Sequence, residues 1–389
     1  MPPNRNLLIL ATASASPGLA QLPKALVRAG FNVGAVAPEG GLILATRYLS
    51  VSAALPGALD VPAYVDAMLG LMKLWRFETI IPGDDWSVRY LHAIAAQAEE
   101  GKVPGPLANV VLRSAMPKPH RALIETKAGV IELARSLGLD APEQIRPASA
   151  EAVRAFCRTH GVPVVVKSDF STSGAGVLVL DDEERAVRAA LGHNPGCKVP
   201  WSPEILMVQR FIRGTPASVA LACREGAVLG AFCYATERAN PEPTGAATVI
   251  RTIDRPDMLA AAGRLVDALK LTGLVGFDFL VEEGTGRAFL LELNPRPPQS
   301  AHIGALVGVD LCAALAGAAA GRAEPGQTVA LFPGEWIRDP DSPYLLSALH
   351  PVPWEDVALL SAIVETRAAA RRPTERLPAT VSFRLVPSL

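Results

Sequence analysis

The feature that most constrains this chain is a pair of short apolar segments, residues 274–282 and 288–294, with polar side chains set among leucines and phenylalanines. The stretch Glu-Gly-Thr-Gly-Arg between them is typical of a β-hairpin loop. If the hairpin is symmetric about Thr285, Asp278 and Glu292 are opposed across the two strands. Asn294 then shares their face, because side chains two residues apart on a strand project to the same side.

Two carboxylates and an amide oxygen on one face are the hard ligands that Mg²⁺ prefers. Two such ions would offset the charge of a phosphate during its transfer, and Mn²⁺ is a substitute of similar ligand preference. The alternative is that the three side chains are ordinary polar groups on a solvated sheet face. Glu292 lies between leucines, where an unpaired carboxylate would be costly, so we predict that Asp278, Glu292 and Asn294 form a metal site.

Composition excludes several classes of partner. Half of the 389 residues are hydrophobic and 19% are charged, which predicts two or three packed domains rather than a disordered chain. The net charge of −1 gives no global attraction to nucleic acid or to an anionic membrane. We therefore expect small-molecule partners.

The cysteines and the N-terminus bear on location. Five cysteines without a C-x-x-C pair indicate a reduced, cytoplasmic protein. The apolar residues 7–11 after Arg5 imitate a signal peptide, but Pro17-Gly18 and an amphipathic stretch at 21–28 favour a buried strand followed by a helix. No apolar run is long enough to predict a membrane span.

The pattern along the chain predicts an α/β region followed by α+β regions. Strands at 7–11, 33–37 and 79–82 alternate with helical stretches, which indicates βαβ units and a parallel sheet. Residues 114–119 are typical of a linker, and residues 121–138 and 150–160 are predicted helices. A strand at 162–167, a partner at 176–180 and a helix at 182–191 form a smaller unit.

The second half of the chain is dominated by predicted strands. Segments 205–211, 217–223 and 227–235 predict an antiparallel sheet, and helices are predicted at 260–271 and 310–321. The proline-rich remainder is expected to wrap the body.

A loop of small residues follows a lysine at the end of the strand at 162–167. Backbone N–H groups at glycines can approach an anion, hydroxyls add donors and Lys167 adds a charge. A plain hairpin turn with a surface lysine would look similar. The chain contains neither G-x-x-x-x-G-K-[ST] nor G-x-G-x-x-G. The predicted phosphate-binding residues here are Lys167, Ser171, Thr172, Ser173, Gly174 and Gly176.

Taken in order, these motifs resemble the ATP-grasp superfamily over roughly residues 5–321. They are Lys127, Lys167 with its loop, the segment Val-Gln-Arg-Phe-Ile-x-Gly at 208–214, Gly-Phe-Asp at 276–278, and Glu-Leu-Asn-Pro-Arg at 292–296. The resemblance implies a pre-ATP-grasp α/β domain (1–115), an N-terminal lobe with the lid (116–213), a C-terminal lobe with the metal site (214–321) and an extension (322–389).

The resemblance also implies roles for individual residues. Lys127 and Lys167 would bind the phosphates of ATP, and Asp278, Glu292 and Asn294 would hold magnesium. The adenine would be held by Gln209, by the backbone near Arg210 and Ile212, and by Leu280 beneath the ring. Arg296 would meet the acyl phosphate, and Arg251 would be a second arginine for the phosphate or the substrate. Surface salt bridges are the alternative for both arginines.

One departure from the family pattern concerns the ribose. Many relatives carry G-x-E after the hinge, whereas this chain has Gly-Thr-Pro at 214–216. Pro216 has no side-chain acceptor for the ribose hydroxyls, so another group must serve.

The resemblance implies an enzyme that joins a small carboxylate to an amine through an acyl phosphate, releasing ADP and phosphate. Residues 295–302, with His302, also resemble a stretch of carboxyaminoimidazole ribonucleotide synthetase, a bicarbonate-activating enzyme, although Pro298 replaces its first histidine. A packing role is the alternative for His302. A nucleotide-sensing subunit is the third reading. We expect residues 236–247 and the tail after residue 321 to determine which substrates bind. The sequence is compatible with a homodimer.

Overall fold

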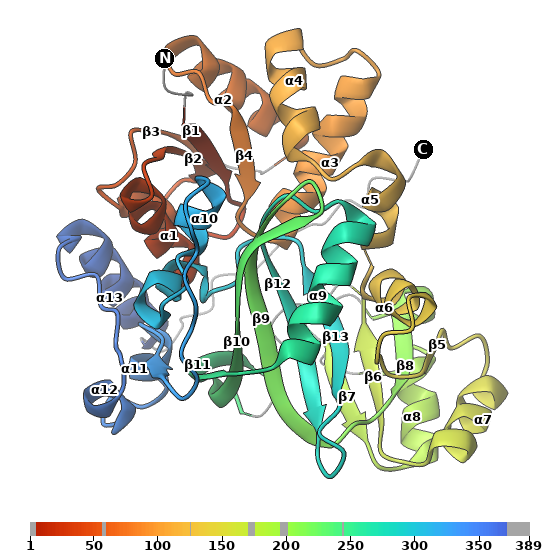
Figure 1. Cartoon of the computed structure of the whole chain (residues 1–389). Coiled ribbons are helices and arrows are strands. Elements are labelled where there is room, and N and C mark those ends of the chain that lie inside the picture. Colours follow the sequence, from red (N-terminus) through yellow and green to blue (C-terminus); the bar gives the residue numbers. More distant parts are fainter. Residues whose placement is uncertain are drawn as a thin grey trace.

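The computed structural model describes residues 5–56, 60–124, 126–169, 176–194, 201–242 and 245–371. Its N-terminal part is a parallel sheet in the order β3-β2-β1-β4 (Figure 1). The strands are β1 (Asn6–Leu10), β2 (Asn32–Pro38), β3 (Val51–Leu55) and β4 (Thr79–Pro82). This sheet confirms the α/β expectation for the N-terminal region.

Helices cover both faces of this sheet because β1 is apolar on both sides. Leu7 and Ile9 pack in one cluster with α1 (Pro17–Arg28) and the 3₁₀ turn η1 (Leu42–Ala45). Leu8 and Leu10 pack in another cluster with α2 (Val61–Leu74), α3 (Asp85–Glu99) and α4 (Gly105–Ser114). Asp84 caps α3 by accepting from the Ser87 N–H, which places the start of this helix at the carboxyl end of β4.

A small second unit follows, with the sheet order β5-β8-β6-β7. Its helices α7 and α8 pack on the sheet in a cluster of their own. Its elements are β5 (Gln144–Ile145), α7 (Ala150–His160), β6 (Val164–Ser168), β7 (Val177–Leu180), α8 (Glu183–Ala190), η2 (Pro203–Ile205) and β8 (Leu206–Arg210). The two helices that precede it, α5 (Lys118–Ile124) and α6 (Lys127–Ser136), pack in the hydrophobic cluster of the large sheet instead.

The largest sheet has six antiparallel strands in the order β13-β12-β9-β10-β11-β14. Its strands are β9 (Gly214–Arg224), β10 (Ala227–Asn240), β11 (Ala246–Ile253), β12 (Gly273–Glu282), β13 (Ala288–Asn294) and β14 (Thr328–Ala330). One face packs against α9 (Pro256–Leu269) and α6, and the other faces the N-terminal unit. Figure 1 shows the smaller sheet, β5-β8-β6-β7, beside the β13 edge of this larger one.

The C-terminal segments pack on the rest of the molecule. They are η3 (Ala301–Val307), α10 (Leu311–Leu315), α11 (Gly334–Arg338), α12 (Tyr344–Ser347) and α13 (Val357–Arg371). Leu331, Phe332 and Leu359 join the same hydrophobic cluster as α1. The expectation that this region wraps the body is therefore confirmed as far as Ile363, which joins the same cluster.

Several sequence predictions of local structure were wrong. The single helix at 121–138 is two helices, because Thr126 caps α6 by accepting from the Gly129 N–H. The linker predicted at 114–119 is shorter than expected, because Ser114 ends α4 and Lys118 begins α5, which leaves residues 115–117 as the connection. The helix at 310–321 ends at Leu315, since Gly317 and Gly321 adopt positive φ values of 90° and 85°.

One strand prediction gave the wrong partner strands, and one segment that was not predicted to be strand is mostly strand. Strand β8 does not join β9 and β10, because it pairs with β5 and β6 in the smaller sheet. Residues 236–247, which we expected to set substrate choice as a loop, are mostly the end of β10 and the start of β11. Alternating apolar patterns identify strands but not their partners, which explains the first error. Within the described residues, no helix is long and apolar enough to span a membrane.

Candidate active site

The hairpin of β12 and β13 brings Asp278 opposite Glu292, as predicted. The register has two parts, however. Near the loop, Leu280 pairs with Phe289 and Phe279 with Leu290, and beyond an irregularity at Leu291 the pairing passes to Asp278 and Glu292. A β-bulge at Leu291 therefore compensates for a loop that is one residue shorter than the symmetric hairpin assumed.

The three predicted metal ligands form one polar cluster. The Asn294 amide donates to Asp278 Oδ2 at 2.8 Å, and the Ser218 hydroxyl on β9 donates to Asp278 Oδ1 at 2.7 Å. Burial raises the pKa of Glu292, and the neighbouring Asp278 raises it further, whereas Lys127 lowers it. A carboxylate in that environment gains stability from any additional cation.

Two lysines lie near this cluster, one on α6 and one on β6 of the small unit. Lys127, the first residue of α6, lies with its Nζ 3.3 Å from Glu292 Oε2. Lys167 on β6 is 6% exposed. Burial lowers the pKa of Lys167 to about 8, and the charge of Lys127 lowers it too, while Glu292 and Asp169 oppose the shift. Both lysines therefore contribute positive charge where the two sheets meet.

Arg296 connects the cluster to the N-terminal unit. Its Nε and one terminal nitrogen donate to the Asp85 carboxylate at 2.8 and 3.1 Å. Burial opposes the charge on Arg296, but Asp85, Glu292 and Asp278 raise its pKa. Asp85 was missed from the sequence. The available signal was its place after β4, because polar groups at the carboxyl ends of parallel strands often form ligand sites.

The predicted adenine-binding residues lie on or beside the small sheet and β12. Gln209 on β8 is buried and donates from Nε2 to the Gln144 side chain at 3.2 Å. Arg210 is paired with Glu143 at 2.6 Å, and Ile212 is 5% exposed. Leu280 is opposite Pro216 across β12 and β9. Pro216 therefore lies within the sheet, and the ribose contact stays open.

Part of the predicted phosphate loop lies outside the described residues, namely Ser171, Thr172, Ser173 and Gly174. Gly176 is described, and its carbonyl accepts from the Ser168 N–H at 2.9 Å. This bond holds the far end of the loop beside Lys167.

Two predicted catalytic residues are not brought to the cluster. Arg251 on β11 pairs with Ala235, and the pairing continues across the sheet to Phe279. Its side chain therefore projects from the face that carries Phe279, which is opposite to the face that carries Asp278. Its guanidinium is bound to Glu237 at 2.5 and 3.1 Å. His302 lines a separate cavity beside α1. Sequence spacing could not reveal either placement.

The donor set suits a hard divalent cation. Asp278 and Glu292 supply carboxylate oxygens, Asn294 supplies an amide oxygen on the same face, and the burial of Glu292 favours a cation beside it. No cluster of three or more His, Cys, Asp or Glu side chains suited to a metal occurs in the described part of the chain. A metal held by these three residues would therefore need water and phosphate oxygens to complete its coordination, as Mg²⁺ commonly does.

Comparison with known proteins places this site in a recognised domain. Residues 126–300 match the family model described as an ATP-grasp domain. The formate-dependent phosphoribosylglycinamide formyltransferase of Synechococcus sp. (strain RCC307) is 26% identical over 168 residues. The match spans 42% of this chain and 42% of that relative.

Solved structures share the fold at low sequence identity. The biotin carboxylase domain of Hydrogenobacter thermophilus 2-oxoglutarate carboxylase, in complex with MgADP, ADP and bicarbonate, superposes with a TM-score of 0.60 at 17% identity, covering 82% of this chain and 70% of that one. An L-amino acid ligase from Bacillus licheniformis gives a TM-score of 0.57 at 16% identity, covering 84% of this chain and 78% of that one. N5-carboxyaminoimidazole synthetase from Staphylococcus aureus gives a TM-score of 0.57 at 14% identity, covering 83% of this chain and 79% of that one.

Proposed function

We propose that this chain, which has the ATP-grasp fold and carries an ATP-grasp domain over residues 126–300, is an ATP-dependent ligase that joins a small carboxylate to an amine. The observation that carries the proposal is the single cluster of Asp278, Glu292, Asn294, Lys127 and Lys167, with Arg296 beside it. Such a set of charges is suited to the transfer of a phosphoryl group.

The binding of ATP follows from the charges on each side of the cluster. Lys127 and Lys167 would contact the phosphates, and the loop ending at Gly176 would cover them. Gln209, Leu280 and the backbone near Arg210 and Ile212 would hold the adenine. Bound magnesium would supply charge neutralisation of the phosphates, held by Asp278, Glu292 and Asn294.

The first chemical step is attack of a substrate carboxylate oxygen on the γ-phosphorus of ATP. The new O–P bond forms as the bond to ADP breaks, which gives an acyl phosphate and ADP. Arg296 would orient the reacting carboxylate, because its guanidinium is held in one position by Asp85. The two lysines offset the negative charge that accumulates on the transferred group.

The second step is attack of the amine nitrogen on the acyl carbon. The C–N bond forms, the C–O bond to phosphate breaks, and the amine proton leaves to phosphate or solvent. Arg296 also favours the oxyanion that forms during this addition. The described site contains charge-stabilising groups rather than a strong base, which fits an electrophile already activated as an acyl phosphate.

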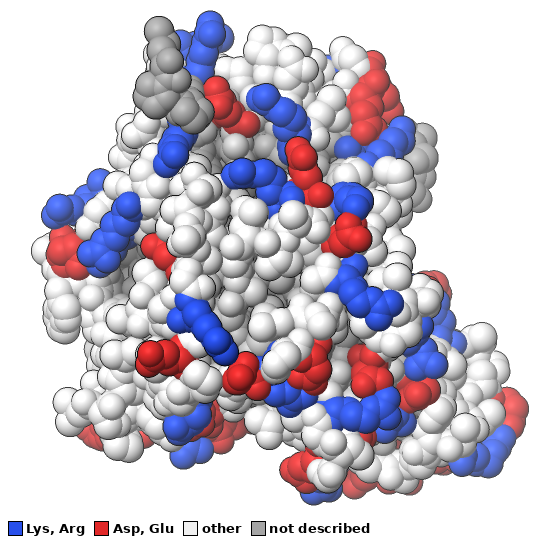
Figure 2. All heavy atoms as spheres, in the orientation of Figure 1, with Lys and Arg blue, Asp and Glu red and all other residues white. Residues whose placement is uncertain are grey.

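The named relatives support this class of reaction without identifying the substrates. One is a formate-dependent formyltransferase and one is an L-amino acid ligase. Figure 2 shows basic and acidic side chains interspersed over the face in view, which fits small-molecule substrates better than nucleic acid.

A second candidate is activation of bicarbonate, favoured by the likeness of residues 295–302 to carboxyaminoimidazole ribonucleotide synthetase and by the solved structures of that enzyme type. The placement of His302 outside the cluster weakens this candidate. A nucleotide sensor is a third candidate, and the retained ligand set of Asp278, Glu292 and Asn294 argues against it.

An ADP-release assay separates the three candidates. The protein is supplied with MgATP and, in separate reactions, with pools of amino acids, other carboxylates with amines, and bicarbonate. Release that needs both a carboxylate and an amine supports the ligase. Release with bicarbonate supports the carboxylase, and no release with any pool supports the sensor.

Glu292→Ala tests the cluster itself. We expect turnover to fall by at least about 1000-fold with an unchanged circular dichroism spectrum, because the variant loses a proposed metal ligand and the carboxylate that forms an ion pair with Lys127. Glu283→Ala is the matched control, since Glu283 is exposed in the loop of the same hairpin. Full activity of Glu292→Ala would contradict the assignment of the metal ligands.

A further inference from the structure

A row of polar side chains crosses the large sheet at the level of the proposed metal ligands. Glu292 on β13 is opposite Asp278 on β12. The register continues from Asp278 to Ser218 on β9, and from Ser218 to Tyr234 on β10. Because residues directly opposed on neighbouring strands project to the same face, all four side chains lie on the metal face. The polar row therefore extends two strands beyond Asp278.

The surroundings of this row are apolar. Ala220 and Phe232, two residues further along β9 and β10 on the same face, belong to the hydrophobic cluster that also contains Tyr234. Ser218 is 9% exposed and Tyr234 is 8% exposed. Hydroxyl groups buried on such a face cost free energy unless they form hydrogen bonds. The partners of these two hydroxyls therefore matter.

The hydrogen bonds along the row can run in only one direction. The carboxylate of Asp278 only accepts, so the Ser218 hydroxyl, 2.7 Å from Oδ1, donates its single proton to that bond. Tyr234 can then bond to Ser218 only as the donor. The Ser300 hydroxyl in turn donates to the Tyr234 oxygen at 3.2 Å. The result is a chain of donors that begins at Ser300 and ends on Asp278.

The middle member of this chain interacts with both serines. Burial, together with the nearby Asp278, raises the pKa of Tyr234 to about 12, although hydrogen bonds with Ser300 and Ser218 oppose the shift. The Tyr234 hydroxyl therefore keeps its proton near pH 7 and is available as a donor.

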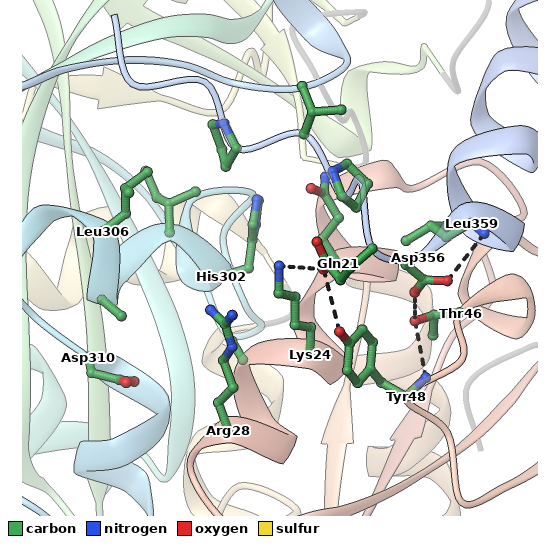
Figure 3. Close-up of a pocket in the computed structure, with 17 residues that line it drawn as sticks. Gln21, Lys24, Arg28, Thr46, Tyr48, His302, Leu306, Asp310, Asp356 and Leu359 are labelled. Carbon is green, nitrogen blue, oxygen red and sulfur yellow. Dashed lines mark hydrogen bonds and ion pairs between the residues drawn. The ribbon is translucent and has the colours of Figure 1, made fainter.

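Ser300 comes from the segment that follows β13 and carries Arg296. It is 1% exposed, at the start of η3. His302, two residues further on, instead contributes to the wall of the cavity of about 390 Å³ beside α1, together with Lys24 (Figure 3). Within residues 295–302, it is therefore Ser300 rather than His302 that is linked to the metal cluster.

We propose that Tyr234, supported by Ser300, is a positioning residue for Asp278, an inference that rests on the proposed role of Asp278 as a metal ligand. By donating to Ser218, Tyr234 would keep the Ser218 hydroxyl directed at Oδ1, while the Asn294 amide donates to Oδ2. The carboxylate then keeps one orientation, with its remaining lone pairs available to the ion. Removing an outer hydrogen bond of this kind commonly costs about 10- to 100-fold in metal affinity.

Binding of Mn²⁺ alone, followed by the electron paramagnetic resonance signal of the free ion, tests this role. Asp278→Asn shows how much of the affinity depends on Asp278. Tyr234→Phe should bind Mn²⁺ about ten-fold more weakly than the parent, because it loses the hydroxyl and keeps the ring. Ser300→Ala should weaken binding only about three-fold, because Tyr234 can still donate to Ser218.

Tyr64→Phe is the matched control. Tyr64 is also a buried tyrosine, and its hydroxyl donates to the Ala11 carbonyl at 2.6 Å within the N-terminal unit. Both phenylalanine variants lose an interior hydrogen bond, so thermal melts should show a similar loss of stability. Only Tyr234→Phe should change the dissociation constant of Mn²⁺.

A double variant tests whether Tyr234 acts through Ser218. Ser218→Ala removes the donor to Asp278 Oδ1. Adding Tyr234→Phe to this variant should weaken Mn²⁺ binding by no more than about two-fold, because the link between the tyrosine and the carboxylate is already broken. A full ten-fold effect of about the size seen in the parent would contradict the chain of donors.

Two further results would overturn the role of Tyr234: parent-like Mn²⁺ affinity in Tyr234→Phe, or equal weakening in Tyr64→Phe. Parent-like affinity in Asp278→Asn would overturn the proposed metal site itself, and this inference with it. Because the readout is Mn²⁺ binding without nucleotide, a failure to find ligase activity with any substrate would leave these results unchanged.

Discussion

At the scale of single residues, the site is an electrostatic balance in which each charge depends on its neighbours. Lys167 is buried beside Lys127, and the two positive charges repel each other, an effect that the carboxylate of Glu292 offsets. Glu292 is in turn partly buried and lies next to Asp278. ATP phosphates would relieve the repulsion between the lysines, and a divalent cation would relieve that between the carboxylates.

The pKa of Lys167, about 8, leads to a pH dependence of ATP binding. Above pH 8 the free protein loses the proton on Lys167, so ATP affinity should fall by up to about ten-fold per pH unit. Lys167→Arg should remove this pH dependence between pH 7 and 9, because arginine keeps its charge. Equilibrium dialysis with labelled ATP measures both, and a parallel pH profile for the two proteins would contradict the role of Lys167.

As pH rises above 8, the free energy of unfolding should increase, whereas the affinity for ATP should fall. The folded pKa of Lys167 lies below the ordinary lysine value of 10.5, so between these values the unfolded chain binds more protons. The contribution of Lys167 to the free energy of unfolding should therefore rise as pH increases from about 8 to 10.5. Below pH 8 its burial is a constant destabilisation, which bound ATP would remove.

At the scale of elements, the bulge at Leu291 decides which residues share the metal face. A one-residue slip without a bulge would send Glu292 and Asn294 to the opposite face, into the cluster that contains Phe277 and Leu293. The loop closes through the Glu282 N–H and the Arg287 carbonyl at 2.9 Å, so its midpoint is not at Thr285. The predicted pairing was right, although the symmetry used to derive it was not.

Two single-residue deletions in β13 test whether Leu291 is the extra, unpaired residue of the bulge and Leu293 a paired residue of the strand. Deleting Leu291 removes the extra residue and leaves the pairings on both sides intact, so we expect ATP-dependent turnover to stay within about ten-fold of the parent. Deleting Leu293 moves Asn294 to the other face, and turnover should be lost. Thermal melts of both variants show whether each is folded, and loss of activity in the folded Leu291 deletion would contradict this account.

At the scale of the whole molecule, Arg296 and Asp85 join parts of the chain that are 211 residues apart. Asp85 begins α3 at the edge of the parallel sheet, and Arg296 follows β13 at the edge of the antiparallel sheet. The proposed binding group for the carboxylate, Arg296 held by Asp85, is therefore in place only when the N-terminal unit and the large sheet are packed together.

Removing this link should affect the carboxylate rather than ATP. In Asp85→Asn, Arg296 loses its charged partner, and we expect kcat/KM for the carboxylate substrate to fall about 100-fold. The KM for ATP should stay within about two-fold. Asp66→Asn, an exposed position on α2, is the control. A larger change in the KM for ATP than in kcat/KM for the carboxylate would contradict the role given to Asp85.

The sequence by itself determined the ATP-grasp fold, the boundaries of most strands to within a few residues, and the pairing of Asp278 with Glu292. These are properties of local apolar periodicity and of motifs that follow one another along the chain. The tertiary structure decided that β8 belongs to the small sheet, that Arg251 faces away from the cluster, that Asp85 holds Arg296, and that His302 lines a second cavity. Contacts between distant segments depend on which faces pack together, and a one-dimensional pattern of side chains does not encode that choice directly.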